Sequence, residues 1–240
     1  MTMQNSKPKY KRVLLKLSGE ALANGSSEIV DGEFIGKIAD VLKKCQNAGV
    51  EFGVIVGAGN IWRGRQGKNM DQTRADYMGM LATTINALAL QDAFIQSGID
   101  TRVMTAIDMH QFAEPYIRNR ALHHLEKGRV VIFGCGLGIP FLSTDTAAVL
   151  RAAEIKAEIV LMAKNIDGIY TADPRKDPSA HKLDSIEYKE ILSQGLAALD
   201  STATSFSMDN HMPILAFGLN DPENIYRAVM GEEIGTLIKD

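Results

Sequence analysis

Several residues of this chain have the types and spacing needed to bind phosphate groups. Lys16 stands near the end of an apolar run and precedes a Ser-Gly turn, and Arg63 follows Gly57 and Gly59. Glycines after a strand let backbone N–H groups approach an anion, and the arginine fork can hold phosphate oxygens at two points. A lone glycine turn is often only a turn, and Lys16 alone also fits a solvated side chain at a sheet edge.

A second glycine-rich loop contains Gly134, Gly136 and Gly138 and leads to Asp145, near the expected start of a helix. Free N–H groups at such a helix start bind anions. Asp145 cannot itself bind phosphate without a cation. Three roles therefore stay open for it: helix capping, a partner for Mg²⁺, or a partner for Lys16.

Hydrophobic periodicity predicts strands that alternate with helices along the whole chain. The expected strands are 13–17, 50–56, 101–104, 129–133, 158–162, 214–217 and 236–238. The expected helices are 32–48, 76–96, 115–127, 146–153, 188–194, 202–211 and 223–230. Residues 22–31 are expected to form a loop, and Asp167-Gly168 is typical of a hairpin turn.

This alternation predicts an α/β fold with a mostly parallel sheet covered by helices on both faces. In such folds, ligands bind beyond the carboxyl ends of the strands. Lys16, the Gly57 loop, the Gly134 loop and the segment from Lys164 onward all follow strands. We therefore expect them to gather at one edge of the sheet, which favours a functional role over a set of unrelated turns.

The composition of the 240 residues excludes several classes of protein. A net charge of −3 gives no general attraction for nucleic acid or an anionic membrane. No apolar run approaches the roughly 20 residues of a membrane span, and the N-terminus lacks the apolar core of a signal peptide, so a cytoplasmic protein without membrane contact is expected. Two cysteines and no HExxH spacing argue against a disulfide framework and against a metal held by protein ligands alone.

The remaining features fit phosphoryl transfer. The motif GxxxxGK[ST] is absent, and the first glycine loop does not match GxGxxG, so neither a P-loop enzyme nor a nicotinamide-binding fold is supported. Two neutral phosphate-binding loops, a lysine, an arginine and carboxylates for Mg²⁺ are the set that phosphoryl transfer needs, because its catalysis is mostly positioning and charge neutralisation.

Five motifs, in order, resemble those of bacterial uridylate (UMP) kinases of the amino-acid kinase superfamily. They are KLSGEAL at 16–22, GAGNIWRG at 57–64, DYMGMLAT at 76–83, PFLSTD at 140–145 and DGIYTADP at 167–174. The resemblance extends over residues 11–240 and implies a single αβα domain preceded by a tail of residues 1–10. It also implies transfer of the ATP γ-phosphoryl group to UMP, giving UDP and ADP in pyrimidine biosynthesis. A Mg²⁺ requirement, a homohexamer and allosteric inhibition by UTP are further implications.

The resemblance also assigns roles to individual residues. Those implied to be catalytic are Lys16, Arg63 and Asp145, with Asp145 orienting Lys16 and the metal. Those implied to bind ATP are Lys16, Leu17, Ser18, Gly19, Ala58, Gly59, Arg63, Lys164, Asn165, Tyr170 and Asp173. Those implied to bind UMP are Gly57, Asp76, Gly136, Leu137, Gly138, Ile139, Pro140, Phe141, Leu142, Ser143 and Thr144. Within the last set, Asp76 is expected to accept hydrogen bonds from the ribose hydroxyls.

Two departures from the family pattern bear on specificity and regulation. The loop that usually reads GTGNP or GTGSP carries Leu137 and Ile139 here, which weakens base selectivity if side chains read the uracil. Of the basic residues associated with GTP binding, only Arg102 and Arg129 are matched. Activation by GTP is therefore expected to be weak or absent.

Two rival functions remain to be separated. A kinase of the same superfamily could phosphorylate a carboxylate or carbamate, but Asp76 is a poor neighbour for an anionic acceptor. The same scaffold could also bind nucleotide for storage or sensing without turnover, and retention of Lys16, Arg63 and Asp145 argues against that function.

Overall fold

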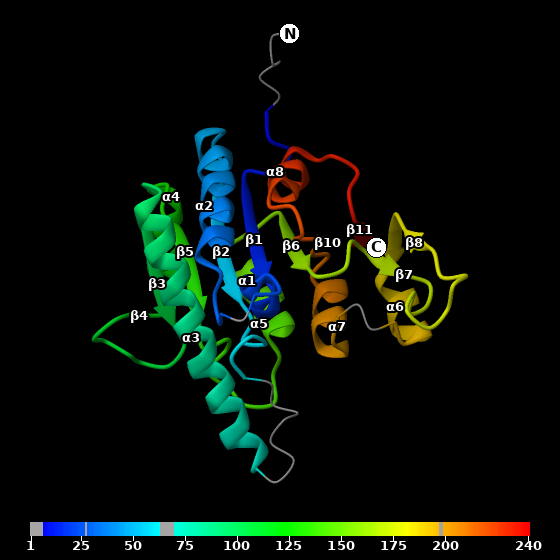
Figure 1. Ribbon diagram of the computed structural model, residues 1–240, viewed down its shortest axis with the longest axis horizontal. Helices are drawn as coiled ribbons and strands as arrows, with labels where there is room; N and C mark the ends of the chain where they lie inside the picture. Colours follow the sequence, from blue (N-terminus) through cyan, green and yellow to red (C-terminus); the bar gives the residue numbers. More distant parts are fainter. Residues whose placement is uncertain (1–6, 27, 63–69, 197–198) are drawn as a thin grey trace.

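The computed structural model describes residues 7–26, 28–62, 70–196 and 199–240. Its centre is a nine-stranded sheet with the strand order β4-β3-β5-β2-β1-β6-β10-β11-β9, and β7 and β8 form a separate two-stranded sheet (Figure 1). In the nine-stranded sheet, β10 and β11 pair antiparallel and the other neighbouring strands of the described residues pair parallel. The expected mostly parallel α/β fold is therefore confirmed.

The strands are β1 Arg12–Leu17, β2 Glu51–Val56, β3 Thr101–Thr105, β4 Glu114–Pro115, β5 Val130–Gly134, β6 Ile159–Lys164, β7 Ile169–Tyr170, β8 Lys182–Leu183, β9 Ser185–Glu187, β10 Ile214–Gly218 and β11 Thr236–Lys239. The helices are α1 Gly19–Ala23, α2 Gly32–Asn47, α3 Gln72–Gln96, α4 Arg118–Glu126, α5 Thr144–Glu154, α6 Tyr188–Gln194, α7 Ser201–Asp209 and α8 Glu223–Met230.

Two hydrophobic cores lie on opposite faces of the sheet. Buried side chains of α2, α3 and α8 belong to the first core, and those of α4, α5, α6 and α7 belong to the second. Successive residues of a strand point to opposite faces. Leu15 and Leu17 of β1 accordingly enter the first core and Leu14 enters the second. The same alternation places Lys16 on the face of the sheet that α5 covers.

The boundaries of two helices differ from the sequence expectation. Helix α3 begins at Gln72 rather than Asp76, because Asp71 caps it by accepting a hydrogen bond from the Arg74 backbone N–H at 3.2 Å. Helix α4 begins at Arg118, and Pro115 lies in the edge strand β4 instead of the first helical turn. Proline is tolerated in an edge strand because it donates no ladder hydrogen bond there.

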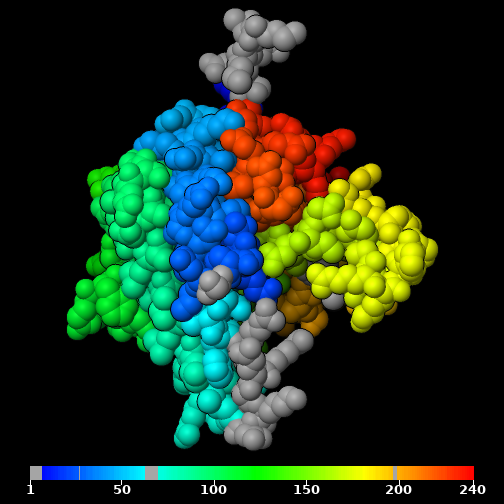
Figure 2. All heavy atoms as spheres, viewed as in Figure 1, coloured from blue at the N-terminus to red at the C-terminus, as the bar shows by residue number. Residues whose placement is uncertain are grey.

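Two shorter segments were also predicted incorrectly. The turn after β1 continues into the short helix α1, which includes residues 22–23 of the expected loop. Asp167-Gly168 does not close a hairpin between β6 and β7, because β7 pairs antiparallel with β8. Figure 2 shows the region around β7, β8 and α6, coloured yellow-green to yellow, as a lobe at the side of the molecule.

Helix α3 is the one helix of the described ranges that is long and apolar enough to cross a membrane by length and composition. However, 44% of its apolar window is buried inside the protein. Its residues Ala87, Leu90 and Phe94 pack in the first core. These contacts are those of a helix that packs on a sheet, and its first turns extend beyond the sheet layer (Figure 1).

Candidate active site

An ion pair between Lys16 and Asp145 lies at the carboxyl end of β1. The Lys16 Nζ atom is 3.0 Å from Asp145 Oδ1, and the two side chains are 11% and 20% exposed. Lys16 reaches this position because it points to the α5 face of the sheet. Asp145 stands in the first turn of α5, where Ser143 caps the helix by accepting hydrogen bonds from two backbone N–H groups. The helix dipole also favours a carboxylate at that position.

The charges around this pair determine the protonation of its carboxylate. Burial would raise the pKa of Asp145, but the ammonium groups of Lys16 and Lys164 outweigh it and hold that pKa below 3.8. Burial lowers the pKa of Lys164; the carboxylate of Asp145 opposes this shift and Lys16 adds to it. Two lysines and one carboxylate therefore meet where β1 and β6 end.

The two predicted phosphate loops touch each other beside this pair. A Cβ atom added to Gly19 would lie 2.6 Å from the Gly57 carbonyl oxygen and 2.7 Å from the Gly59 nitrogen. The Gly57 N–H in turn donates a hydrogen bond of 2.9 Å to the Leu17 carbonyl oxygen. Only glycine at position 19 permits this approach, so the two loops form one continuous backbone surface.

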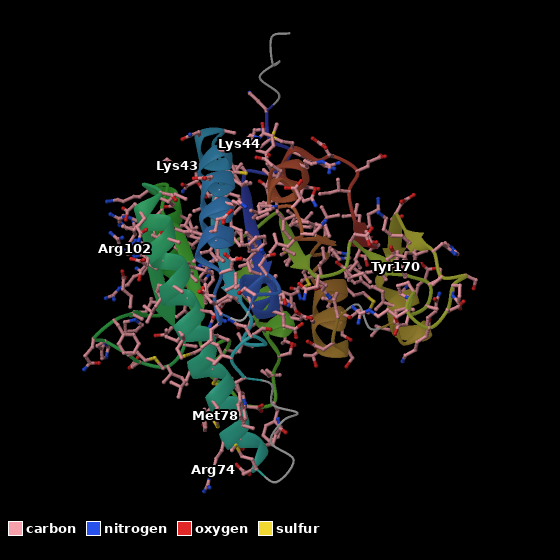
Figure 3. All side chains as sticks on the ribbon, viewed as in Figure 1. Lys43, Lys44, Arg74, Met78, Arg102 and Tyr170 are labelled. Atoms are coloured by element: carbon pink, nitrogen blue, oxygen red, sulfur yellow. The ribbon has the colours of Figure 1, made fainter. Side chains whose placement is uncertain are left out.

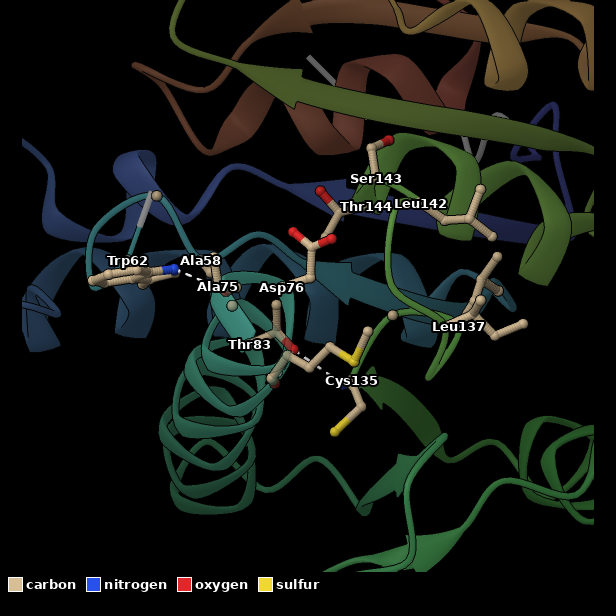
Figure 4. Close-up of a pocket in the computed structure, with 15 residues that line it drawn as sticks. Ala58, Trp62, Ala75, Asp76, Thr83, Cys135, Leu137, Leu142, Ser143 and Thr144 are labelled. Carbon is tan, nitrogen blue, oxygen red and sulfur yellow. Dashed lines mark hydrogen bonds between the residues drawn. The ribbon is translucent and has the colours of Figure 1, made fainter. Parts of the chain in front are cut away.

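A cavity of about 190 Å³ opens on the other side of the Gly57 loop. Figure 4 shows Asp76 and Thr144 facing this space, with Ala58 and Trp62 on one side and Leu137 on the other. The Trp62 Nε1–H donates to the Ala75 carbonyl oxygen at 2.9 Å. This bond ties the residues that follow β2 to the first turn of α3 on one side of the cavity.

Asp76 links α3 to the glycine-rich segment 134–144. Its Oδ2 atom accepts a hydrogen bond from the Phe141 N–H at 2.8 Å, and its Oδ1 atom accepts one from Gln72 Nε2, also at 2.8 Å. Phe141 has a φ of 69° and its side chain is 74% exposed. Each carboxylate oxygen has further lone pairs, so Asp76 can still accept from a ligand in the cavity.

Two further cavities adjoin the Lys16–Asp145 pair on the β6 side. One has a volume of about 440 Å³ and is lined by Lys16, Ser18, Asn165 and Asp173, among others. The next has a volume of about 540 Å³ and includes Tyr170 in its wall. Lys164 lines both cavities. They are therefore neighbouring parts of one groove that starts at the partly buried ammonium groups of Lys16 and Lys164.

Most of the predicted site residues lie together beyond the carboxyl ends of the central parallel strands. The 190 Å³ cavity is lined by seven of the predicted UMP residues, Asp76, Gly136, Leu137, Ile139, Leu142, Ser143 and Thr144, and also by Ala58 and Gly59, which had been expected on the ATP side. Its lining does not include Gly57, Gly138, Pro140 or Phe141. Leu17 is fully buried in the core, so only its backbone is available to a ligand. The expectation for Arg63 falls outside the described residues.

Some lining residues were not identified from the sequence. Trp62, Ala75, Met80 and Cys135 line the 190 Å³ cavity, and Glu20 and Arg175 line the 440 Å³ cavity. Gly79 and Thr83 also line the 190 Å³ cavity, and the sequence indicated both, because small or slender side chains on a helix let a ligand approach. Burial of Cys135 beside Thr83 is a tertiary contact, in which the Cys135 N–H donates to Thr83 Oγ1 at 3.0 Å.

The donor set fits a magnesium ion that is held mainly by substrate. Asp145 Oδ1 is buried and accepts no aligned hydrogen bond in the described part of the chain, although Lys16 lies within ion-pair distance. Within those residues no three His, Cys, Asp or Glu side chains cluster as a metal site. Mg²⁺ commonly binds through one or two carboxylates together with substrate phosphates. The Asp145 carboxylate, next to Lys16 at the inner end of the groove, is a ligand of this kind.

Comparison with known proteins identifies relatives over almost the whole chain. Residues 11–217 match the amino acid kinase family. The structure resembles that of UMP kinase from Bacillus anthracis, with a TM-score of 0.93, 38% sequence identity and coverage of 96% of each chain. It also resembles UMP kinase from Ureaplasma parvum, with a TM-score of 0.91 and 33% identity over 97% of this chain and 100% of that one. Uridylate kinase from Archaeoglobus fulgidus matches with a TM-score of 0.73 and 30% identity, covering 94% of this chain and 99% of that one. The chain therefore belongs to the amino acid kinase family and, within it, to the group of bacterial UMP kinases.

Proposed function

We propose that this protein transfers the γ-phosphoryl group of ATP to UMP, giving UDP and ADP. The observation that carries the proposal is the Lys16–Asp145 pair, which lies between a compact cavity and an open groove at one edge of the sheet. Phosphoryl transfer needs two nucleotides aligned end to end with cations at the moving group. The fold relatives named above have this activity in their names.

The groove on the β6 side is the proposed ATP site. Lys16 and Lys164 supply positive charge at its inner end, where the phosphates would lie. Asn165, Tyr170 and Asp173 line its outer part and would surround the adenosine. Gly19 and the Gly57 loop would offer backbone N–H groups to the phosphate oxygens.

The 190 Å³ cavity is the proposed UMP site. Asp76 would accept hydrogen bonds from the ribose hydroxyls, since a carboxylate only accepts and hydroxyl groups can donate. The same carboxylate would repel an anionic group, such as a carboxylate or carbamate acceptor, at that position. Segment 136–144 would enclose the uracil. Leu137 and Ile139 offer no side-chain hydrogen bond, so the base would be read by backbone groups and by Thr144.

Asp145 would hold Mg²⁺ together with the ATP phosphates, and the metal would neutralise charge on the moving group. The chain's own residues provide the remaining functions. Lys16 would stabilise charge on the transferring phosphoryl group, and Asp145 would keep the ammonium group in place. No protein nucleophile is needed, because the UMP phosphate attacks in line.

Release of ADP is the direct test of this function. The protein should release ADP with UMP and Mg²⁺ at a rate well above the rates with CMP, glutamate or carbamate as acceptor. Equal rates with glutamate or carbamate would favour a kinase of carboxyl acceptors, and binding of both nucleotides without ADP release would favour a storage or sensing role.

Assembly into a homohexamer is part of the proposal. The outer side of α3 exposes Tyr77, Leu81 and Ile85, which are 45%, 53% and 54% exposed and are spaced four residues apart. This spacing places them on one helical stripe. A contiguous apolar stripe on a soluble enzyme is typical of an interface, and a second copy of α3 would cover it.

Weak or absent activation by GTP is also proposed. Arg102 and Arg129 both pair with Asp100, and the Arg129–Asp100 distance is 2.7 Å. Figure 3 shows Arg102 and Tyr170 at opposite sides of the molecule, so Arg102 lies far from the proposed ATP groove. A several-fold rise in rate on adding GTP at limiting ATP would contradict this part. Inhibition by UTP, a role in pyrimidine biosynthesis, a cytoplasmic location and a single domain over 11–240 complete the proposal.

A further inference from the structure

A pair of asparagine side chains, Asn86 buried and Asn60 partly exposed, connects α3 to the loop that separates the two proposed substrate sites. Asn86 on α3 is 0% exposed. Its Nδ2 atom donates to the Gly57 carbonyl oxygen at 2.7 Å and to Asn60 Oδ1 at 2.8 Å. In return, Asn60 Nδ2 donates to Asn86 Oδ1 at 3.0 Å and to the Ile29 carbonyl oxygen at 2.7 Å.

The orientation of both amides is fixed by this arrangement. A carbonyl oxygen can only accept, so the NH₂ group of Asn86 must face Gly57 and that of Asn60 must face Ile29. The remaining donor and acceptor of each side chain then pair with each other. All of these partners are neutral, and the network ties together α3, the Gly57 loop and the segment before α2.

This network lies directly behind the contact between the two phosphate loops. A Cβ atom on Gly19 would lie 2.7 Å from Asn60 Oδ1 as well as 2.6 Å from the Gly57 oxygen. The position of Asn60 therefore limits how closely the Ser18–Gly19 turn approaches the Gly57 loop. Because Asn86 holds both Asn60 and the Gly57 carbonyl, it fixes the orientation of that carbonyl and, on the opposite side of the same peptide plane, that of the Ala58 N–H.

We propose that Asn86 is a positioning residue for phosphoryl transfer: it orients the Gly57–Gly59 backbone toward the reacting phosphates without touching them. The inference rests on the proposed function, because the loop is expected to contact nucleotides there. Backbone groups aimed at developing charge act mainly in the transition state. Loss of Asn86 should therefore lower kcat more than it raises the KM for either nucleotide.

Two variants and one control test this inference. Asn86→Leu removes both donors and keeps a similar volume, whereas Asn86→Asp keeps the shape and replaces the donor with an acceptor while ionised. Gln46 offers a matched control, because its Nε2 atom donates to the Gly128 carbonyl oxygen at 2.9 Å. That bond lies at the opposite end of the parallel strands, before β5, so Gln46→Leu removes a similar bond far from the site.

The expected result is a selective loss of turnover. Steady-state ADP release should show kcat of Asn86→Leu lowered by about 10- to 100-fold, with each KM changed by less than about threefold, because small misplacements of positioning groups cost rates of this size. Gln46→Leu should keep the kcat of the unchanged protein. Thermal unfolding measured in parallel gives the fraction of folded protein to which each kcat refers.

Asn86→Asp gives a second readout that a purely structural role would not move. A protonated carboxyl can donate to the Gly57 oxygen and an ionised one cannot. The ratio of its kcat to that of the unchanged protein should therefore rise as pH is lowered. If Asn86→Leu does not fold, the pH dependence of Asn86→Asp still tests whether Asn86 acts as a positioning residue.

The outcomes separate the inference from the function on which it rests. If the unchanged protein phosphorylates UMP but Asn86→Leu matches Gln46→Leu in kcat, or the Asn86→Asp ratio is flat with pH, the positioning role is wrong. If the unchanged protein does not phosphorylate UMP, the proposed function fails and the inference falls with it.

Discussion

At the scale of single residues, the Lys16–Asp145 pair is better explained by chemistry than by stability. A buried ion pair often contributes no more to folding than well-packed apolar side chains, because both charges lose their hydration. Here the pair lies at the carboxyl end of the central strand β1, between two cavities and beside a second, partly buried lysine, Lys164. Its position provides fixed charge where an anionic group would move.

The first prediction concerns the charge of Lys16. Replacing it by alanine should lower the rate of ADP release by on the order of 10²- to 10³-fold, the scale for losing one transition-state donor. The rate should be measured at saturating ATP and UMP.

Lys37→Ala is the matched control for this variant. Lys37 pairs with Glu33 on the exposed surface of α2, at 2.7 Å, and should be dispensable for turnover. A Lys16→Ala protein with an unchanged rate would show that this lysine is a structural residue.

The second prediction concerns the response of Asp145 to acid. Its pKa in the folded protein lies below 3.8, so the unfolded chain takes up the proton first as pH falls. The stabilisation is fully present above about pH 5 and is lost as pH falls through the folded pKa. Urea unfolding from pH 7 downward should show a smaller loss of stability for Asp145→Asn than for the unchanged protein, and equal losses would mean that the carboxylate is not paired.

At the scale of elements, replacing a glycine by alanine should have opposite effects on stability in β2 and in α2. A Cβ atom on Gly53 of β2 would lie 2.6 Å from Ile155 Cδ1 and 3.1 Å from Phe133 Cε2, whereas one on Gly36 of α2 would meet nothing within 4 Å. Gly53→Ala should destabilise the protein by about 1–3 kcal/mol through overpacking. Gly36→Ala should stabilise it by about 0.5–1 kcal/mol, because alanine favours the helix. Urea denaturation should be used to measure the free energy of unfolding of both variants. A Gly36→Ala protein less stable than the unchanged protein would show that an alanine side chain at position 36 does not fit without a clash.

The sequence predicted the long elements better than the short ones. β1 and α2 carry strong apolar patterns, and their positions agree with the expectation. β4, β7, β8 and β9 are two or three residues long and carry no pattern of their own, because they are fixed by the strands beside them. The start of α3 was missed for a related reason: the Asp71 cap outweighed the weaker signal at Asp76.

The site could be located from the sequence, but its internal contacts could not. Glycines and charged residues after strands indicated the correct edge of the sheet, because parallel strands all present their carboxyl ends there. The hydrogen bond from the Phe141 N–H to Asp76 joins residues 65 positions apart. The contacts of Asn86 with Gly57 and Asn60 span 29 and 26 positions. Pairings of this kind depend on how α3 crosses the sheet, which no local pattern records.

At the scale of the whole molecule, the outer stripe of α3 determines how copies associate. Arg74 and Met78 mark the end of this helix that extends from the body (Figure 3). Leu81→Glu places a charge in the middle of the exposed stripe, where a buried, unpaired charge would be costly in an interface. Sedimentation velocity should show this variant in smaller species than the unchanged protein.

Leu192→Glu is the control for the assembly prediction. Leu192 lies on α6 and is 38% exposed, so it represents an isolated apolar side chain on another part of the surface. It should sediment like the unchanged protein. Identical sedimentation of Leu81→Glu and the unchanged protein would exclude the α3 stripe as an interface.

The strand order has a consequence for how new substrates could be accommodated. β1 stands in the middle of the sheet, with β2, β5, β3 and β4 on one side and β6, β10, β11 and β9 on the other. The compact cavity is lined by residues between 58 and 144, and the groove by residues between 16 and 20 and between 164 and 196. Under the proposed function, UMP would be recognised mainly by residues 58–144 and ATP mainly by residues 16–20 and 164–196, with the Gly57 loop and Asp145 between the two nucleotides. Exchange of residues 58–144 between relatives should therefore transfer the preference for the acceptor nucleotide and leave the preference for the phosphoryl donor intact.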